Sequence, residues 1–160
     1  VKACQRACEI IAAMEAQHFC EFICSGYEDI VKHCAKYANA VGVDIDENAT
    51  IATAENLEVN NIPADKCKVY TGNILEDKSL EDTVGYECYD IVVANILADV
   101  LLPLTPLVPA HLKKGGLYIT SGIIDTKEAE VKAAIEATGE FEIVEITRQK
   151  DWSSITARRV

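Results

Sequence analysis

The sequence predicts a doubly wound α/β fold with a mostly parallel sheet. Short apolar segments alternate with segments of helical spacing through most of the chain, as in proteins whose helices cover both faces of a parallel sheet. In addition, Ile91 to Ala94 form an unalternating apolar run rich in β-branched residues, which is typical of a strand buried on both faces. We therefore place the strand around Ile91 to Ala94 in the middle of the sheet.

Length and composition fit a single globular domain over residues 1–160. Apolar residues make up 49% of the chain and charged residues 26%. No run approaches the ~20 apolar residues of a membrane helix, and we expect no leader and no membrane contact. The net charge of −11 argues against direct binding to nucleic acid, and it suits a cationic partner such as a basic protein.

The cysteines indicate a reducing compartment, and we expect a cytoplasmic protein. There are 7 of them at irregular spacing, which does not resemble a disulfide framework. Cys4 and Cys8, and again Cys20 and Cys24, stand four residues apart, so a zinc site has to be considered. However, Cys4 and Cys8 share a helix face with Ile11, where free cysteine behaves as a small hydrophobe. No paired C-x-x-C knuckle is present, and we predict no metal site.

The first half of the chain predicts three strands that alternate with helices. In order, we expect a helix over 2–16, a strand over 18–24, a helix over 29–38, a strand over 40–44, a helix over about 47–59 and a strand over 67–71. Asp46 can cap the helix that follows it, because its side chain can accept a hydrogen bond from the backbone. The inward face of that helix is predicted to carry Ile51, Ala54 and Leu57.

The second half of the chain continues the alternation. In order, we expect a surface loop or short helix over 76–87, the central strand, an apolar helical segment over 96–111 interrupted by three prolines, a turn over 113–116, a strand over 117–121, a helix and two final strands over 141–147 and 153–158. Asp125 and Glu128 have capping-box spacing at the start of the last helix, which Gly139 ends. This helix should bury Val131, Ala134 and Ile135. The two final strands are expected to pair antiparallel.

Polar residues follow three predicted strands and should meet at one edge of the sheet, where open α/β sheets bind ligands. Asp44 lies roughly 20 residues after Ser25-Gly26, the spacing at which a carboxylate accepts hydrogen bonds from the ribose of a nucleotide cofactor. A helix cap is the alternative role for Asp44. Asn73 can bind an adenine edge or form an ordinary turn. Asn95 can bind a ligand through its amide, or it can simply turn the chain into the next helix.

Five segments occur in the same order as in a known family. They are residues 41–46 (VGVDID), 94–98 (ANILA), 112–116 (LKKGG), 121–124 (SGII), and Trp152 followed by 156–159 (TARR). Together they resemble the catalytic domain of the PrmA family, the methyltransferases that modify protein eleven of the large ribosomal subunit. The resemblance extends from about Ala40 to the C-terminus, and its Asn-Ile-Leu-Ala segment is fairly specific.

The resemblance implies a fold and an activity. The fold is a seven-stranded, Rossmann-like methyltransferase domain. The activity is the transfer of a methyl group from S-adenosylmethionine to an amino group, on a lysine side chain or an N-terminus, of a ribosomal protein. The family also has a separate N-terminal domain that recruits the substrate. We expect that domain to be absent here, so that residues 1–160 form the catalytic domain alone.

The resemblance also assigns roles to particular residues. Carried over by position, Asp44 binds the cofactor ribose, Ile45 flanks the adenine and Asn73 stands near the adenine edge. Asn95 and the Ile96 carbonyl hold the target amine, and Asn95 also borders the cofactor. Ser25 and Gly26 are what remains of the family's glycine-rich cofactor turn.

The first predicted strand departs from the family pattern. The family has a turn of the form Asp-x-Gly-x-Gly-x-Gly, whereas this chain has Phe22 and Cys24 where glycines are expected, and Glu21 one position away from the acid. A side chain fills ligand space, and positive φ is costly for any residue but glycine. Three interpretations stay open: an altered loop that still binds the cofactor, a non-catalytic methyltransferase-fold module, or a natural sequence that differs in this stretch. The spacing of Asp44 alone would also suit a nicotinamide-dependent dehydrogenase.

Overall fold

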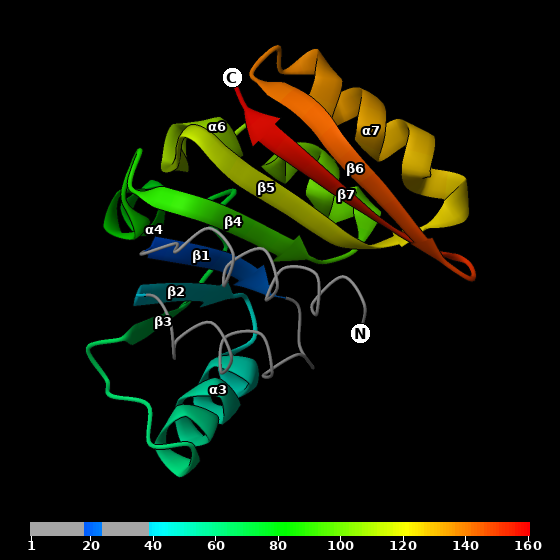
Figure 1. The fold of residues 1–160 in the computed structure, drawn as a ribbon. Helices are drawn as coiled ribbons and strands as arrows, with labels where there is room; N and C mark the ends of the chain where they lie inside the picture. Colours follow the sequence, from blue (N-terminus) through cyan, green and yellow to red (C-terminus); the bar gives the residue numbers. More distant parts are fainter. Residues whose placement is uncertain (1–17, 24–38) are drawn as a thin grey trace.

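The computed structural model describes residues 18–23 and 39–160 of the chain (Figure 1). The helices predicted over 2–16 and 29–38 lie outside these residues, as do Ser25 and Gly26. The first predicted strand lies within them as β1 (His18–Ile23).

Within the described residues, one sheet contains seven strands in the order β3-β2-β1-β4-β5-β7-β6. After β1, they are β2 (Asn39–Asp44), β3 (Cys67–Thr71), β4 (Tyr89–Asn95), β5 (Leu112–Ile124), β6 (Phe141–Gln149) and β7 (Trp152–Arg159). Strands β1 to β5 pair in parallel, and β7 runs antiparallel to both of its neighbours. The predicted doubly wound, mostly parallel α/β class and the antiparallel final pair are confirmed.

The position of β7 argues against a dinucleotide-binding dehydrogenase. Such proteins place strand six next to strand five, in the order 3-2-1-4-5-6. Here the antiparallel β7 lies between β5 and β6. The dehydrogenase alternative therefore does not fit the topology.

The helices pack against the sheet at the places that the alternation predicts. They are α3 (Glu47–Val59), α4 (Lys78–Val84), α5 (Ala98–Leu104), α6 (Val108–His111), the 3₁₀ helix η1 (Asp125–Lys127) and α7 (Glu128–Ala137). Helix α3 contacts β2 and β3, whereas α7 contacts α5 and the strands β5, β6 and β7 (Figure 1). The predicted interruption of the apolar segment 96–111 is confirmed, because α5 and α6 are separate helices.

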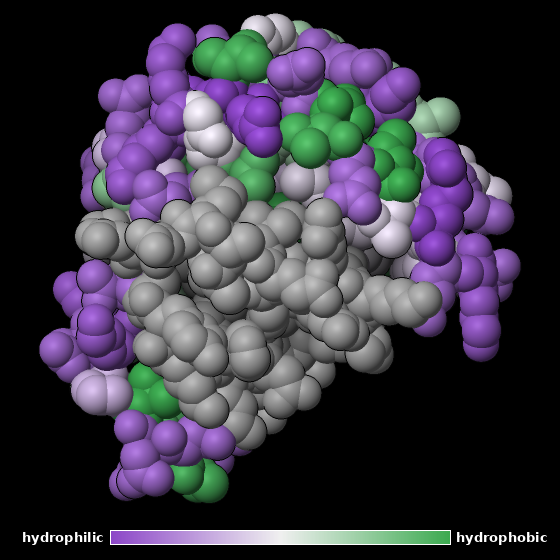
Figure 2. Space-filling model, viewed as in Figure 1, coloured by the Kyte–Doolittle hydropathy of each residue, from purple (hydrophilic) through white to green (hydrophobic). Residues whose placement is uncertain are grey.

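Strand β4 lies at the centre of the core. Ile91 to Ala94 are each at most 2% exposed, and β1 and β5 flank them. Full burial of one aliphatic side chain stabilises a fold by about 1.5–3 kcal/mol, so this short run contributes heavily. The face of the molecule in Figure 2 is different from this core. Its described residues are mainly hydrophilic, with hydrophobic residues scattered between them. The predicted central position of this strand is confirmed.

Helix α3 turns a different face to the sheet than predicted. Asp46 caps it as predicted, because its carboxylate accepts from the backbone N–H of Asn48 at 2.9 Å. Leu57 is buried as predicted, but Ile51 is 51% exposed and Ala54 is also exposed. The other buried residues are Thr50 and Thr53.

The buried face was predicted wrongly because the hydroxyl groups of Thr50 and Thr53 both have hydrogen-bond partners. The Thr53 hydroxyl donates to the Ala49 carbonyl at 2.8 Å, and the Thr50 hydroxyl lies 2.7 Å from that of Thr71 in β3. A hydroxyl with a partner can be buried at little cost, so a prediction that counts only aliphatic residues selects the wrong face.

Two local predictions around β5 and α7 were also wrong. Residues 113–116 do not form a turn before the strand, because β5 begins at Leu112 and these residues bulge out of its pairing with β4. Glu128 does not act as a capping residue, since helix α7 has no side-chain cap. Its carboxylate instead accepts from Arg148 and from the Ser153 hydroxyl, and so joins the start of α7 to β6 and β7.

The buried face of α7 was predicted more closely. Val131 and Ile135 are buried as expected, while Ala134 is only half-buried. Gly139 follows the helix with a φ of +68°, which fits its predicted role as the residue that ends it.

A second bulge interrupts the pairing of β5 with β7. Ser121 and Gly122 together lie opposite Ser154 alone. Two buried hydroxyls stabilise the bulge: Thr120 Oγ1 donates to the Ile155 carbonyl at 3.0 Å, and Ser154 Oγ donates to the Thr120 carbonyl at 2.7 Å. Side chains thus replace the backbone hydrogen bonds that the bulge displaces.

We expect Thr120→Val to lower the free energy of unfolding by about 1–3 kcal/mol, because it leaves the buried Ile155 carbonyl and N–H without the hydroxyl that bonds to both. Urea or guanidinium denaturation measures this change. Thr126→Val is the matched control, since Thr126 is exposed in η1. If the two variants were equally stable, the hydroxyls would not support the bulge.

Candidate functional site

A cavity of 210 Å³ opens at the edge of the sheet where β2, β3 and β4 end. Residues 43–45, 72–75 and 96–97 line it, together with Val100 and Leu104 of α5. Four of the predicted site residues are among them: Asp44, Ile45, Asn73 and Ile96. The structure therefore brings together positions that lie up to 52 residues apart in the sequence (44 to 96).

Asp44 is the last residue of β2 and is only 4% exposed. Its Oδ1 accepts from the backbone N–H of Asp46 at 2.9 Å, while its buried Oδ2 accepts no hydrogen bond from any described residue. Burial raises the pKa of this carboxyl group above its ordinary value. Since the side chain of Asp46 caps α3, the alternative role of Asp44 as that cap is not observed. The site therefore contains a buried acceptor that a ligand hydroxyl could satisfy.

Aliphatic side chains surround the mouth of this cavity. Ile45 is 72% exposed, Leu97 65% and Val100 41%. Binding sites for small molecules commonly combine an apolar wall with a few polar groups that fix orientation. Exposed aliphatic residues next to a buried carboxylate therefore suit a ligand that has both a flat ring and hydroxyl groups.

Asn73 forms a turn and lines the cavity at the same time. Its Oδ1 accepts from the Leu75 N–H at 3.1 Å, and its carbonyl accepts from the Asp77 N–H at 2.9 Å. The turn is therefore present, and its side-chain oxygen is engaged. The side-chain NH₂ makes no hydrogen bond with another described residue, so it is the group that can contact a ligand.

Asn95 and Ile96 place two acceptors next to each other at the end of β4. Asn95 is half-buried and lies between β1 and β5, in register with Ser121. Its Oδ1 and the Ile96 carbonyl oxygen are both close to Gly122, where an added Cβ atom would lie 3.5 Å and 3.1 Å from them. The first turn of α5 bonds to the Leu97 carbonyl instead, and α5 has no side-chain cap. Thus neither acceptor is used to start that helix.

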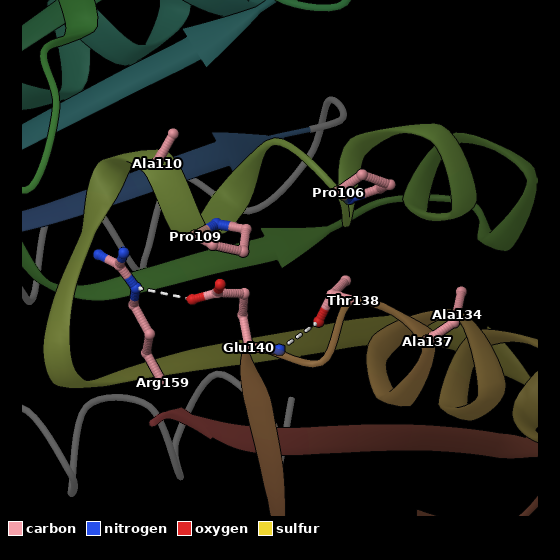
Figure 3. Close-up of a pocket in the computed structure, with 8 residues that line it drawn as sticks. All are labelled: Pro106, Pro109, Ala110, Ala134, Ala137, Thr138, Glu140 and Arg159. Carbon is pink, nitrogen blue, oxygen red and sulfur yellow. Dashed lines mark hydrogen bonds and ion pairs between the residues drawn. The ribbon is translucent and has the colours of Figure 1, made fainter.

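A larger cavity of 630 Å³ lies at a different part of the fold, between α6, the end of α7 and the end of β7 (Figure 3). Its charged groups neutralise each other, because Glu140 lies 3.7 Å from Arg159, which also pairs with Glu87 at 3.1 Å. None of the predicted site residues lines it. We therefore do not assign the candidate site to this cavity.

Three further predictions concern the cofactor turn at Ser25 and Gly26, a metal site and a membrane-spanning segment. Ser25 and Gly26 lie outside the described residues, so their predicted contact with a cofactor stays a prediction. Among residues 18–23 and 39–160, His, Cys, Asp and Glu form no group of three that could hold a metal ion. In the same part of the chain, the helices are too short or too polar to span a bilayer.

Leu97, Val100 and Gly122 are among the residues of this region that were not predicted to belong to the site. Leu97 and Val100 were assigned to an apolar helical segment, but they line the cavity mouth. Gly122 was noted only as part of the segment SGII, although it borders the two acceptors. The adjacency of SGII to the end of the central strand depends on strand pairing, which sequence spacing alone does not reveal.

Solved structures that share this fold include methyltransferases. The ribosomal protein L11 methylase of Lactobacillus delbrueckii subsp. bulgaricus superimposes with a TM-score of 0.83 at 23% identity, over 98% of this chain and 77% of that one. The N-methyltransferase NodS from Bradyrhizobium japonicum, solved in complex with S-adenosyl-L-homocysteine, gives a TM-score of 0.75 at 13% identity, over 99% of this chain and 85% of that one. The fold is thus that of the S-adenosylmethionine-dependent methyltransferases.

Sequence comparison then gives the family. The model of the family "Ribosomal protein L11 methyltransferase (PrmA)" matches residues 25–160, and the chain belongs to this family. A relative of that name in Lachnospira eligens is 54% identical over 129 residues, covering 81% of this chain and 40% of the relative. Another, in Agathobacter rectalis, is 47% identical over 136 residues, covering 85% and 42%. The chain therefore spans about two fifths of the length of these relatives.

The buried carboxyl group of Asp44 should make stability depend on pH. Because its pKa is raised in the folded state, the folded protein holds this proton more tightly than the unfolded chain does. The contribution of this carboxyl group to the free energy of unfolding is therefore largest at low pH, and it decreases as the pH rises through the folded-state pKa. We expect Asp44→Asn, which does not titrate, to gain stability relative to the wild type as the pH rises above about 4, the ordinary pKa of an aspartate.

Urea denaturation of both proteins at several pH values measures this difference. Asp65→Asn, at an exposed turn, is the control for removing a negative charge. A difference between Asp44→Asn and the wild type that did not change with pH would contradict the assignment of a buried, destabilised carboxylate.

Proposed function

We propose that this chain is the catalytic domain of an S-adenosylmethionine-dependent protein N-methyltransferase. Its substrates would be amino groups, on a lysine side chain or an N-terminus, of a ribosomal protein in the cytoplasm. One observation carries the proposal: in a member of the PrmA family, the ends of β2, β3 and β4 bring Asp44, Asn73 and Ile96 to one cavity. The named substrate of the relatives supports a ribosomal protein as the acceptor.

The cavity suits the nucleoside part of the cofactor. The unpaired Oδ2 of Asp44 is a buried acceptor, and a ribose presents two hydroxyl donors to such a group. Ile45 offers an exposed aliphatic surface on which an adenine ring can lie, and the Asn73 NH₂ can donate to a ring nitrogen. A carboxylate at position 44 would also repel a 2′-phosphate.

Asn95 and Ile96 would orient the amine. When bound, the cofactor supplies an electrophilic methyl group on a sulfonium, which a neutral amine attacks in line. The Asn95 Oδ1 and the Ile96 carbonyl can accept the amine N–H groups and thereby direct its lone pair. As positive charge grows on the nitrogen, these hydrogen bonds strengthen, so they stabilise the transition state more than the ground state. Proton loss to solvent before the reaction makes a dedicated base unnecessary.

The charge of the chain favours a basic substrate. With a net charge of −11, the chain attracts a cationic protein over long range. The same charge opposes nonspecific contact with nucleic acid, so the proposed acceptor is a ribosomal protein and not the RNA that it binds.

A non-catalytic module is the second candidate function. The observation that favours it is the sequence of the first strand and its turn, which has Phe22 and Cys24 where the family pattern has glycines. In this alternative, the chain keeps the fold and works through protein contacts, while cofactor binding is impaired.

Calorimetry with S-adenosylhomocysteine tests cofactor binding. We expect the wild-type chain to bind it, and Asp44→Ala to bind roughly 10- to 100-fold more weakly, because one or two hydrogen bonds to a charged acceptor are lost. Asp65→Ala should match the wild type. An absence of heat at millimolar ligand would contradict cofactor binding and favour the non-catalytic module.

Methyl transfer to the ribosomal protein tests the role of Asn95. We expect Asn95→Ala to lower the rate by about 10²-fold, as for the loss of one oriented polar group that acts in the transition state. Its affinity for S-adenosylhomocysteine should fall less than that of Asp44→Ala. Asn39→Ala, at the opposite end of β2, is the control. A wild-type chain that bound the cofactor but transferred no methyl group would support the module instead.

A further inference from the structure

Gly122 lies where β5 passes the end of β4, and its backbone has a φ of +79°. A Cβ atom at this position would be 3.1 Å from the Ile96 carbonyl oxygen and 3.5 Å from the Asn95 Oδ1. Weak C–H···O contacts are normally about 3.3–3.6 Å long, so the distance to the Ile96 carbonyl oxygen is shorter than a normal contact. Any side chain at position 122 would therefore crowd the Ile96 carbonyl oxygen and lie in contact with the Asn95 Oδ1.

The bulge of β5 at Ser121 and Gly122 determines the position of Gly122. Since Ser121 pairs with Asn95 and the bulge follows at once, Gly122 is displaced toward the backbone of Ile96. The hydroxyls of Thr120 and Ser154 hold the bulge from the β7 side, and both residues are buried. A larger residue at 122 could not relieve the contact by a simple shift of β5.

The space beside Gly122 is also the space that an amine needs. A nitrogen that donates to both oxygens lies about 2.7–3.2 Å from each of them. A Cβ atom at 3.1 Å and 3.5 Å from the same oxygens would compete for that region. The methyl group that the nitrogen receives needs additional room next to it.

We propose that Gly122 is a positioning residue of the amine site. Its missing side chain keeps the Asn95 Oδ1 and the Ile96 carbonyl accessible to the amine and to the methyl group that it acquires. This inference rests on the proposed function, and it adds a residue that does not line the cofactor cavity.

Gly115 provides a matched comparison in the same strand. It has a φ of +80°, which equals that of Gly122 within one degree, but an added Cβ atom there would meet nothing within 4 Å. Alanine at either position therefore incurs a similar backbone cost, of the order of 1 kcal/mol. Only alanine at 122 also enters the space beside the two oxygens.

The test compares methyl transfer by Gly122→Ala and Gly115→Ala. For Gly122→Ala, we expect kcat/KM for the protein substrate to fall by roughly 10²-fold, as for a misplaced reacting group. Its affinity for S-adenosylhomocysteine should stay within about threefold of the wild type, because Gly122 does not line the cofactor cavity. Gly115→Ala should keep both properties, and thermal melting should show similar losses of stability for the two alanine variants.

Gly122→Asn separates crowding from backbone strain. Asparagine accepts positive φ more readily than alanine, but its side chain is larger. If strain limited activity, the asparagine variant would be the more active of the two. We expect it to be the less active, because it fills more of the amine site.

The possible failures are distinguishable. A wild-type chain without methyl transfer would overturn the proposed function and this inference together. An active wild type with equal activities for Gly122→Ala and Gly115→Ala would overturn this inference alone. So would a Gly122→Asn variant more active than Gly122→Ala, or a Gly122→Ala variant whose cofactor affinity falls as much as its activity.

Discussion

Burial of β4 on both faces is the constraint from which the arrangement of the site follows. Residues 91–94 have almost no contact with solvent, so the polar groups of this strand must lie at its ends. Parallel pairing through β1 then puts the end of β4 at the same edge as the ends of β2 and β3. The cavity is formed at this edge because there the chain leaves the core, and Asp44, Asn73 and Ile96 line it.

The two polar parts of the site are built differently. Asp44 is a buried carboxyl group with one oxygen left without a partner among the described residues, and this arrangement is unfavourable until a ligand donates to it. The pair formed by Asn95 and Ile96 combines a side-chain oxygen with a backbone carbonyl, both neutral.

Sequence reasoning reached the features that depend on local chemistry. The strand Cys67–Thr71, the cap at Asp46 and the meeting of Asp44 and Asn73 at one edge follow from residue type, spacing and the rule for parallel sheets. Ile45 and Ile96, which line the same cavity, were expected in the site only from the resemblance to the PrmA family. Features that depend on distant partners were not predicted. Glu128 bonds to Arg148 rather than capping α7, and Thr50 is buried with its hydroxyl against that of Thr71 in β3. The roles assigned to the site residues remain predictions, and Ser25 and Gly26 lie outside the described residues.

The aliphatic mouth of the cavity has an energetic consequence for any ligand that enters it. Ile45, Leu97 and Val100 expose hydrocarbon to water when the cavity is open, and a ring that covers them releases this hydration. Part of the binding free energy then comes from dehydration of the protein itself, which is marked by a negative change in heat capacity. Asp44 would select a ribose with free hydroxyls, while the affinity for the nucleoside would depend on how much of this wall the base covers.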